Sequence, residues 1–98
     1  NPTWETVLDV DALSDLEKKP KVFILRMRFV PSIDASGLHA IKEFHHKCQR
    51  QGIQLVVSGV NPQPLLALKN SGLYGLIGSE NIYDHIDKAL ARARELTS

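Results

Sequence analysis

The segment that most constrains the fold is a short loop between an apolar run and an amphipathic run. The apolar run covers residues 22–27, Val-Phe-Ile-Leu-Arg-Met, and the amphipathic run extends from Leu38 to Arg50. A continuous apolar run of this length is typical of a strand that is covered on both faces, whereas the later spacing indicates a helix. The loop 30–37, Val-Pro-Ser-Ile-Asp-Ala-Ser-Gly, therefore connects the carboxyl end of a buried strand to the start of a helix.

This helix start is the first candidate site. Asp34 or Ser36 can accept a hydrogen bond from the free backbone N–H groups of the first turn. The same donors, at the positive end of the helix dipole, favour an anion or a phosphoryl group. Two interpretations remain open at this point: capping alone, or capping combined with a regulatory or recognition role.

The other patterns predict strands and helices in alternation. Strands are expected over 21–28 and 53–58, with a very short third strand at Ile82-Tyr83. Helices are expected over about 4–18 (with Trp4 as an apolar anchor), over 38–50, from an Asn61 cap to Gly72, and after an Asp84 cap. Residues 73–77 are interpreted as an apolar connector. This order indicates a parallel sheet with right-handed crossovers, in which ligands gather at the carboxyl ends of the strands.

Each helix should bury one side. In the helix 38–50, His39 and Lys42 lie on the outer side, and Gly52 can end the helix in a left-handed conformation. The residues expected on the buried sides are Leu38, Ile41, Phe44, His45 and Cys48 in this helix, Leu65, Leu66 and Leu68 in the next, and Ile86, Ala89, Leu90, Ala93 and Leu96 in the last.

Composition excludes several classes of protein. The 98 residues suit one domain, 1–98, and the charge of +1, from 12 basic and 11 acidic residues, does not favour nucleic acid as a partner. The single cysteine, Cys48, cannot form an internal disulfide or a multi-cysteine zinc site, and we expect it to be a buried thiol. No apolar run reaches the roughly 18–20 residues that span a bilayer, and no signal peptide is visible.

Catalytic chemistry is not indicated. Ser36 lacks the Gly-x-Ser-x-Gly context of a hydrolase nucleophile, and the glycine-rich phosphate loops of nucleotide enzymes are absent. The histidines at 39, 45, 46 and 85 do not form a convincing set of metal ligands. We therefore expect no enzyme activity, no cofactor and no metal. Arg26 and Arg28 share one face at the end of the first strand, either as a solvated strand end or as a contact for an anion or partner.

Several segments together resemble a STAS domain, in particular the carboxy-terminal cytoplasmic STAS domain of SulP-type anion transporters such as sulfate permeases. The resemblance extends over about residues 20–95 and rests on ordered motifs. These are the runs 22–27 and 30–38, Gly-Ile-Gln-Leu-Val-Val-Ser-Gly-Val-Asn at 52–61, Leu-Lys-Asn-Ser-Gly-Leu at 68–73, and Glu-Asn-Ile-Tyr at 80–83.

The resemblance implies an α/β fold of the anti-sigma factor antagonist type, with a small central β-sheet and about four helices. In the antagonists, the serine that directly follows the loop aspartate accepts phosphate from a kinase. Here that position is Ala35, and Ser36 matches the second serine, so the loop fits the transporter branch better. Family members usually begin with one or two strands before the first helix, whereas Asn1 leads almost directly into the helix expected here. Without those strands, an edge of the strand at 22–27 would be open for pairing.

The resemblance thus implies a non-enzymatic regulatory and protein-interaction domain on the cytoplasmic side of the cell membrane, as a fragment of a sulfate or anion transporter. Its partners would be the transmembrane portion of its own transporter and a cytoplasmic protein. Two alternatives are a stand-alone partner-switching protein of the antagonist type, which needs phosphate on Ser36, and a module with weak nucleotide binding. The residues expected to meet an anion or partner are Asp34, Ala35, Ser36, Gly37, His39 and Lys42.

Overall fold

The structure is a computed structural model that describes residues 21–97. The helix predicted over 4–18, with Trp4, lies outside the described residues. The elements follow in the order β1 (Val22–Arg26), α3 (Ala35–Arg50), β2 (Gln54–Ser58), α4 (Pro62–Ser71), α5 (Leu73–Ile77), a 3-10 turn η1 (Ser79–Asn81) and α6 (Ile86–Thr97). None of the helices within 21–97 is both long and apolar enough to cross a bilayer.

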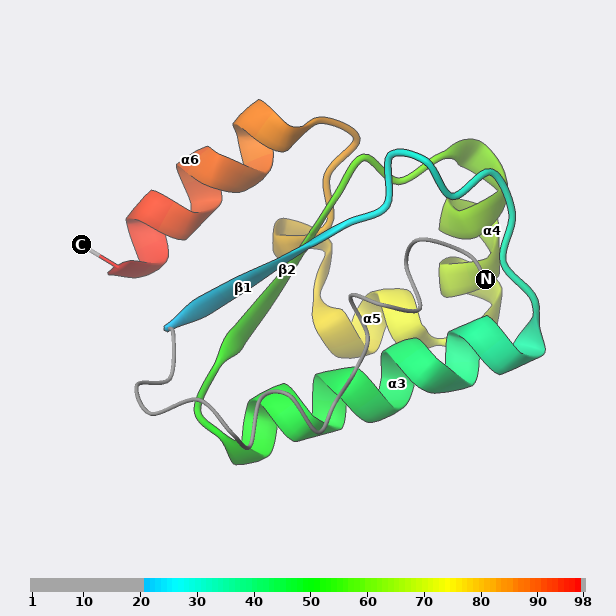
Figure 1. Cartoon of the computed structure of the whole chain (residues 1–98), viewed down its shortest axis with the longest axis horizontal. Helices are drawn as coiled ribbons and strands as arrows, with labels where there is room; N and C mark the ends of the chain where they lie inside the picture. Colours follow the sequence, from blue (N-terminus) through cyan, green and yellow to red (C-terminus); the bar gives the residue numbers. More distant parts are fainter. Residues whose placement is uncertain (1–20, 98) are drawn as a thin grey trace.

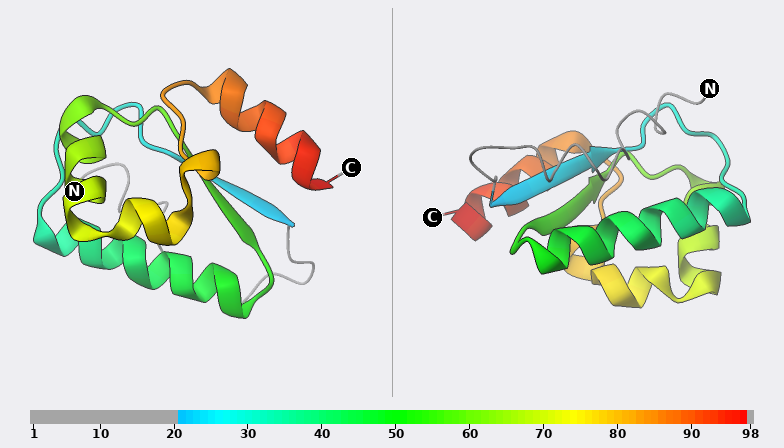
Figure 2. Two further views of the ribbon diagram at one scale, coloured as in Figure 1. Left: turned by 180° about the vertical axis from the view of Figure 1, so that it is seen from behind. Right: turned by 60° about the horizontal axis from the view of Figure 1, so that its bottom comes forward.

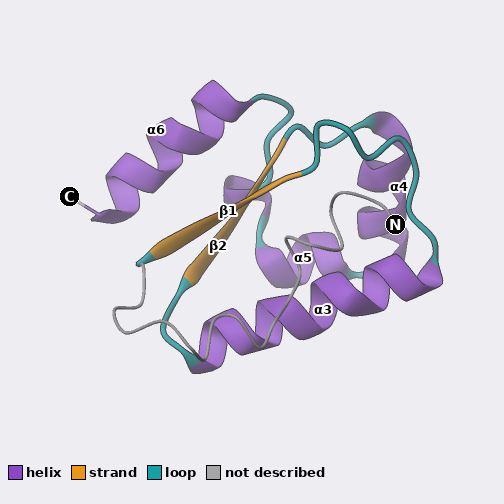
Figure 3. Cartoon of the chain, in the orientation of Figure 1, coloured by secondary structure: helices purple, strands orange, loops and turns teal. Residues whose placement is uncertain are grey.

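The two strands form a parallel pair at the centre of the molecule (Figure 3). Their register runs from Val22 opposite Gln54 to Arg26 opposite Ser58. The third strand predicted at Ile82-Tyr83 is reduced to a single parallel bridge between Val57 and Ile82. The parallel α/β architecture expected from the alternating pattern is therefore confirmed, with a smaller sheet in the described part of the chain.

Helices cover both sides of this sheet. Figures 1 and 2 show α3, α4 and α5 on one side and α6 on the other. Because side chains alternate along a strand, Phe23 and Leu25 face α3 with their register partners Leu55 and Val57. The intervening residues, including the fully buried Val56, face α6.

The core lies between the sheet and α3, α4 and α5. Phe44 of α3 is fully buried, and its ring meets the Phe23 ring edge to face at a centroid distance of 4.9 Å. Cys48 is buried, as predicted from its place in the helical pattern. Gly52 follows α3 with φ +72°, which confirms the predicted left-handed end of that helix.

Several predicted boundaries are wrong. The first strand ends at Arg26, because residues 28–29 form a turn, and the helix expected from Leu38 begins three residues earlier, at Ala35. The run 73–77, interpreted as a connector, forms the short helix α5, which the apolar contacts of Leu73 and Ile77 hold against the core.

Two side-chain assignments in the later helices are also wrong. Leu66, predicted to be buried, is 58% exposed, because Pro64 and Leu68 supply the fully buried positions of α4. Leu90 of α6 is 40% exposed, and Ala89 is the residue of that helix that is completely buried. α6 therefore covers its side of the sheet with a much smaller apolar surface than α3.

Candidate functional site

The loop that leads from β1 into α3 starts with a tight turn. The Met27 N–H donates to the Ser58 carbonyl at 2.8 Å, and the Val30 N–H donates to the Met27 carbonyl at 3.0 Å. This turn brings Gly59 against the backbone of Arg28. Gly59 has φ +69°, and a Cβ atom there would lie 3.0 Å from the Arg28 Cα atom, so the close approach needs a residue without a side chain.

Two amide side chains at the start of α4 hold this loop in place. The Asn61 Nδ2 group donates to the carbonyls of Arg28 at 3.0 Å and of Val30 at 2.9 Å. The Gln63 Oε1 atom accepts from the Ile33 N–H at 2.7 Å, and its Nε2 atom donates to the Ile33 carbonyl at 3.3 Å. Asn61 occupies the predicted N-cap position, but its side chain makes no capping bond there, because it is bound to the loop.

Asp34 is the residue that caps α3. Its backbone is extended, with φ −101° and ψ −175°, and its Oδ1 atom accepts from the Gly37 N–H at 2.9 Å. The Asp34 carbonyl accepts the first helical hydrogen bond, from the Leu38 N–H at 3.0 Å. Of the two capping candidates, the structure thus selects Asp34 and places Ser36 in the first turn of the helix.

The residues predicted for the site gather at this end of α3. Gly37 is buried against the rest of the protein, whereas Asp34, Ala35 and Ser36 are exposed. His39 and Lys42 follow on the exposed side, and the His39 Nε2 atom lies 4.0 Å from the Glu43 Oε1 atom. An exposed surface therefore extends over the first two turns of α3; we call these residues, Asp34, Ala35, Ser36, His39 and Lys42, the α3 tip.

A second polar region lies at the same end of the sheet, on the side of α6. A pocket of about 250 Å³ opens there, between the ends of the strands and the start of α6. The sequence predicted that Arg26 and Arg28 share a face, but no local pattern indicated that they line a pocket. Its lining includes Arg26, Arg28, Ser58, Gly59, Asp84 and His85.

Asp84 does not have the capping role that the sequence predicted. Helix α6 begins at Ile86, and the Ala89 N–H donates to the carbonyl of His85 at 3.3 Å. The Asp84 carboxylate instead pairs with the Lys88 ammonium group at 3.1 Å, and this hydrogen-bonded pair holds the pKa of Asp84 below its usual value.

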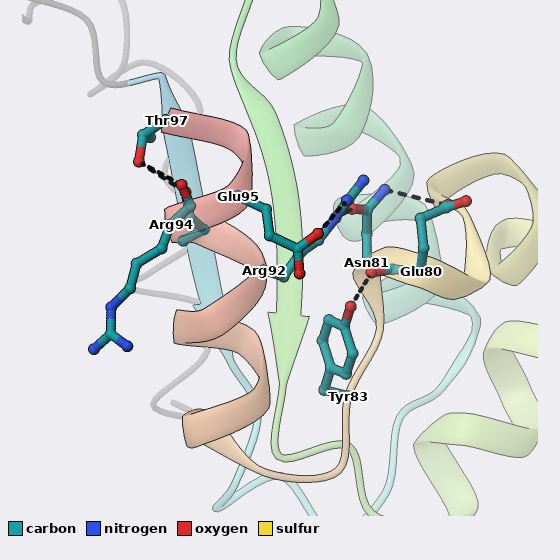
Figure 4. A network of polar contacts seen from close by, with 8 residues as sticks. Glu80, Asn81, Tyr83, Arg92, Arg94, Glu95 and Thr97 are labelled. Carbon is teal, nitrogen blue, oxygen red and sulfur yellow. Dashed lines mark hydrogen bonds and ion pairs between the residues drawn. The ribbon is translucent and has the colours of Figure 1, made fainter.

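α6 is tied to the preceding turn by polar contacts around Asn81 (Figure 4). Asn81 is buried; its Nδ2 group donates to the Ile77 carbonyl at 3.0 Å, and its Oδ1 atom accepts from the Arg92 Nε group at 3.1 Å. Arg92 also pairs with Glu95 at 3.5 Å. These bonds attach the middle of α6 to the end of α5.

The titratable side chains on the inner side of α3 are desolvated. Burial, followed by the neighbouring charge of His46, lowers the pKa of His45, whose buried Nδ1 atom has no hydrogen-bond partner among residues 21–97. Burial raises the pKa of the Cys48 thiol to about 11, so this thiol is not a nucleophile at neutral pH. Within residues 21–97, no three His, Cys, Asp or Glu side chains are grouped so that they could hold a metal ion.

The family model of the STAS domain matches residues 8–89. The chain belongs to the STAS domain family. Among curated proteins, it is 31% identical over 81 residues to the putative sulfate transporter YvdB of Bacillus subtilis, and 36% identical over 67 residues to the probable sulfate transporter 4.2 of Arabidopsis thaliana. These matches cover 83% and 68% of this chain, but only 15% and 10% of the relatives, so this STAS domain corresponds to a small part of each relative.

Solved structures show the same fold. A sulfate transporter family protein from Wolinella succinogenes is 45% identical, with a TM-score of 0.88 over 99% of this chain and 81% of that structure. The STAS domain of a SulP transporter from Vibrio cholerae, at 24% identity, has a TM-score of 0.85 over 98% of this chain and 75% of that structure. The STAS fold expected from the motifs is thus confirmed.

Proposed function

We propose that this chain is the cytoplasmic STAS domain of a SulP-type sulfate or anion transporter, and that it is a regulatory docking module without catalytic activity. The observation that carries the proposal is the likeness to sulfate transporters, of which the chain corresponds to one small part. Its place would be on the cytoplasmic side of the membrane, next to the transmembrane portion of the same protein.

The α3 tip is the surface that we assign to docking. The Asp34 carboxylate accepts a hydrogen bond from the Gly37 N–H, which fixes the backbone of the α3 tip. The Asn61 and Gln63 amides hold the loop that leads into the α3 tip. A rigid and exposed surface of this kind can bind a partner with little loss of conformational entropy. Lys42 adds a positive charge, which can meet an acidic group on the membrane portion or on a cytoplasmic protein.

Site-directed cross-linking tests this assignment in the full-length transporter. Cys48 is buried and its thiol has a pKa of about 11, so a cysteine introduced at the surface would be the reactive thiol of the domain. Ser36→Cys places this thiol on the α3 tip, and a photoactivatable maleimide then attaches to it. Arg50→Cys, at the exposed far end of the same helix, is the matched control.

In a background without exposed cysteines in the membrane portion, we expect the position 36 variant to cross-link to that portion several-fold more than the position 50 variant. Equal yields, or a preference for position 50, would contradict docking through the α3 tip. Anion uptake by His39→Ala and Lys42→Ala variants gives a functional measure, because both side chains are exposed and their loss should leave folding unchanged.

Ser36 supports a second candidate, partner switching by phosphorylation, because it is exposed in the first helical turn. A phosphate there would lie at the positive end of α3. Incubation with the kinases of the source cell, followed by mass spectrometry, tests this candidate. Phosphate on Ser36 would favour the antagonist type, and an unmodified chain would leave the transporter proposal in place.

A further inference from the structure

The pocket beside α6 contains two arginines that come from one face of one strand end. Arg26 is the last residue of β1, and its register partner Ser58 is the last residue of β2. Arg28 follows two residues after Arg26, and both arginines line the pocket of about 250 Å³. The pocket thus lies at the carboxyl ends of two parallel strands, where open α/β sheets commonly bind ligands.

Neither guanidinium group forms an ion pair within the described part of the chain. Among residues 21–97, the ion pairs are formed by other side chains, and no carboxylate pairs with Arg26 or Arg28. The Arg28 guanidinium lies over the ring of Phe29, 5.1 Å from its centroid, and Phe29 is itself 77% exposed. Two cations that share a pocket and form no ion pair among the described residues favour an anionic ligand.

The opposite side of the pocket is formed by the residues that lead into α6. Asp84 carries a carboxylate there, but the Lys88 ammonium group binds it at 3.1 Å. The His85 Nδ1 atom lies 3.2 Å from the Asp87 N–H and 3.5 Å from the Asp87 Oδ2 atom. Of the charged side chains that line the pocket, Arg26 and Arg28 are positive and Asp84 is negative, which leaves one positive charge in excess when His85 is neutral.

We propose that this pocket binds a phosphate group, either free or as the end of a small phosphomonoester. The planar guanidinium groups can each donate two hydrogen bonds to phosphate oxygens. The volume of this pocket is smaller than the roughly 300–1,000 Å³ of pockets that bind drug-sized ligands. A pocket of this size suits a small metabolite. This inference goes beyond the docking role and does not depend on it, because the pocket and the α3 tip involve different side chains.

Titration of the 98-residue chain by calorimetry and two-dimensional NMR tests the proposal. The ligands are inorganic phosphate and glycerol phosphate at low ionic strength, with sodium chloride at equal ionic strength as the blank. We expect saturable shifts of amides near residues 26–28, 58–59 and 84–86. Tighter binding of glycerol phosphate identifies a phosphomonoester site, and equal or weaker binding identifies a site for free phosphate. Shifts that match the chloride blank for both ligands would overturn the proposal.

Substitutions distinguish specific binding in this pocket from a general effect of the protein's positive charge. Arg26→Gln and Arg28→Gln should each weaken binding by about tenfold or more, because each removes charged hydrogen-bond donors. Arg50→Gln removes the same charge from the far end of α3 and should change the affinity by less than about twofold. Equal losses in all three variants would overturn the assignment.

A further variant should strengthen binding. Asp84→Asn keeps the size of the side chain but removes the carboxylate from the pocket, so phosphate should bind several-fold more tightly. Because the Asp84–Lys88 pair is exposed, its loss should leave folding intact, and thermal unfolding of each variant checks this. Unchanged or weaker binding by a folded Asp84→Asn variant would contradict the placement of the ligand.

Discussion

Helices α3 and α6 cover opposite sides of one small sheet, yet they are held in different ways. α3 buries Ile41, Phe44 and Cys48 in the core and is capped by the Asp34 side chain. α6 buries only Ala89 completely and depends on the polar contacts around Asn81. Apolar contact thus fixes the first helix, whereas hydrogen bonds carry a larger share of the attachment of the second.

The two helices also begin differently, although both start at the carboxyl ends of the strands. At α3, the Asp34 carboxylate already satisfies the Gly37 N–H group, and the exposed side chains of the α3 tip surround this end of the helix. At α6, Asp84 is turned to Lys88, and two arginines stand across the pocket. This difference is why we assign docking to α3 and anion binding to the side of α6.

The largest effect should come from the core under α3. Phe44→Ala removes a fully buried ring and its contact with Phe23, so we expect a loss of about 3–5 kcal/mol in the free energy of unfolding, measured with urea. Leu90→Ala on α6 should cost less than about 1 kcal/mol, because that side chain is 40% exposed. Equal costs would refute the contrast between the two helices.

The second effect concerns the polar attachment of α6. Asn81→Ala removes a buried amide and leaves the Ile77 carbonyl and the Arg92 Nε group without this partner, so we expect a loss of about 2 kcal/mol. Hydrogen exchange should show faster opening of α6 than of α3 in this variant. Arg94→Ala, at an exposed position of the same helix, is the control and should stay within about 0.5 kcal/mol of the parent. Equally fast opening of both helices would contradict the conclusion that the Asn81 hydrogen bonds stabilise α6 locally.

A smaller effect separates the two helix starts. Asp34→Ala removes the capping bond to the Gly37 N–H and should cost about 1 kcal/mol. Asp84→Ala removes an exposed pair that caps nothing, and should cost less than Asp34→Ala. Chemical denaturation of both variants measures the difference. A greater loss from Asp84→Ala would indicate that the Asp84–Lys88 pair stabilises the start of α6 more than the Asp34 cap stabilises α3.

The smallest effect is a dependence on pH. Burial lowers the pKa of His45 in the folded protein, so the unfolded chain binds a proton more readily. Stability should therefore be complete above the unfolded value of about 6.5 and should decline as the pH falls towards the folded value. His45→Gln should flatten this decline in denaturation series between pH 8 and 5, whereas His39→Gln, on the exposed side, serves as the control. An unaltered slope in the His45 variant would contradict the assignment.

Much of the fold could be predicted because its signals are local. The apolar runs at 22–27 and 53–58 indicated both strands, and the spacing of Ile41, Phe44 and Cys48 indicated the buried side of α3. The Asp-Ala-Ser-Gly loop was correctly placed at the helix start, since Asp34 has the short side chain that a cap needs.

The errors have physical causes of a different kind. Helix α5 has five residues between glycines, which is too short for a helical period to be visible. Asn61 looked like a helix cap, but the loop that follows β1 competes successfully for its amide. The pocket joins residues 26, 58 and 84, and only the crossover geometry brings such distant positions together.

The Gln63 amide has a consequence for how force would pass through the protein. It bonds both the N–H and the carbonyl of Ile33, as a neighbouring strand would, directly ahead of the helix start. A partner that pulls on the α3 tip would therefore load α4 through these two hydrogen bonds, in addition to the force that the chain carries back to β1. If the two Gln63 hydrogen bonds broke under that force, the loop would separate from the first turn of α4 while the apolar core stayed assembled.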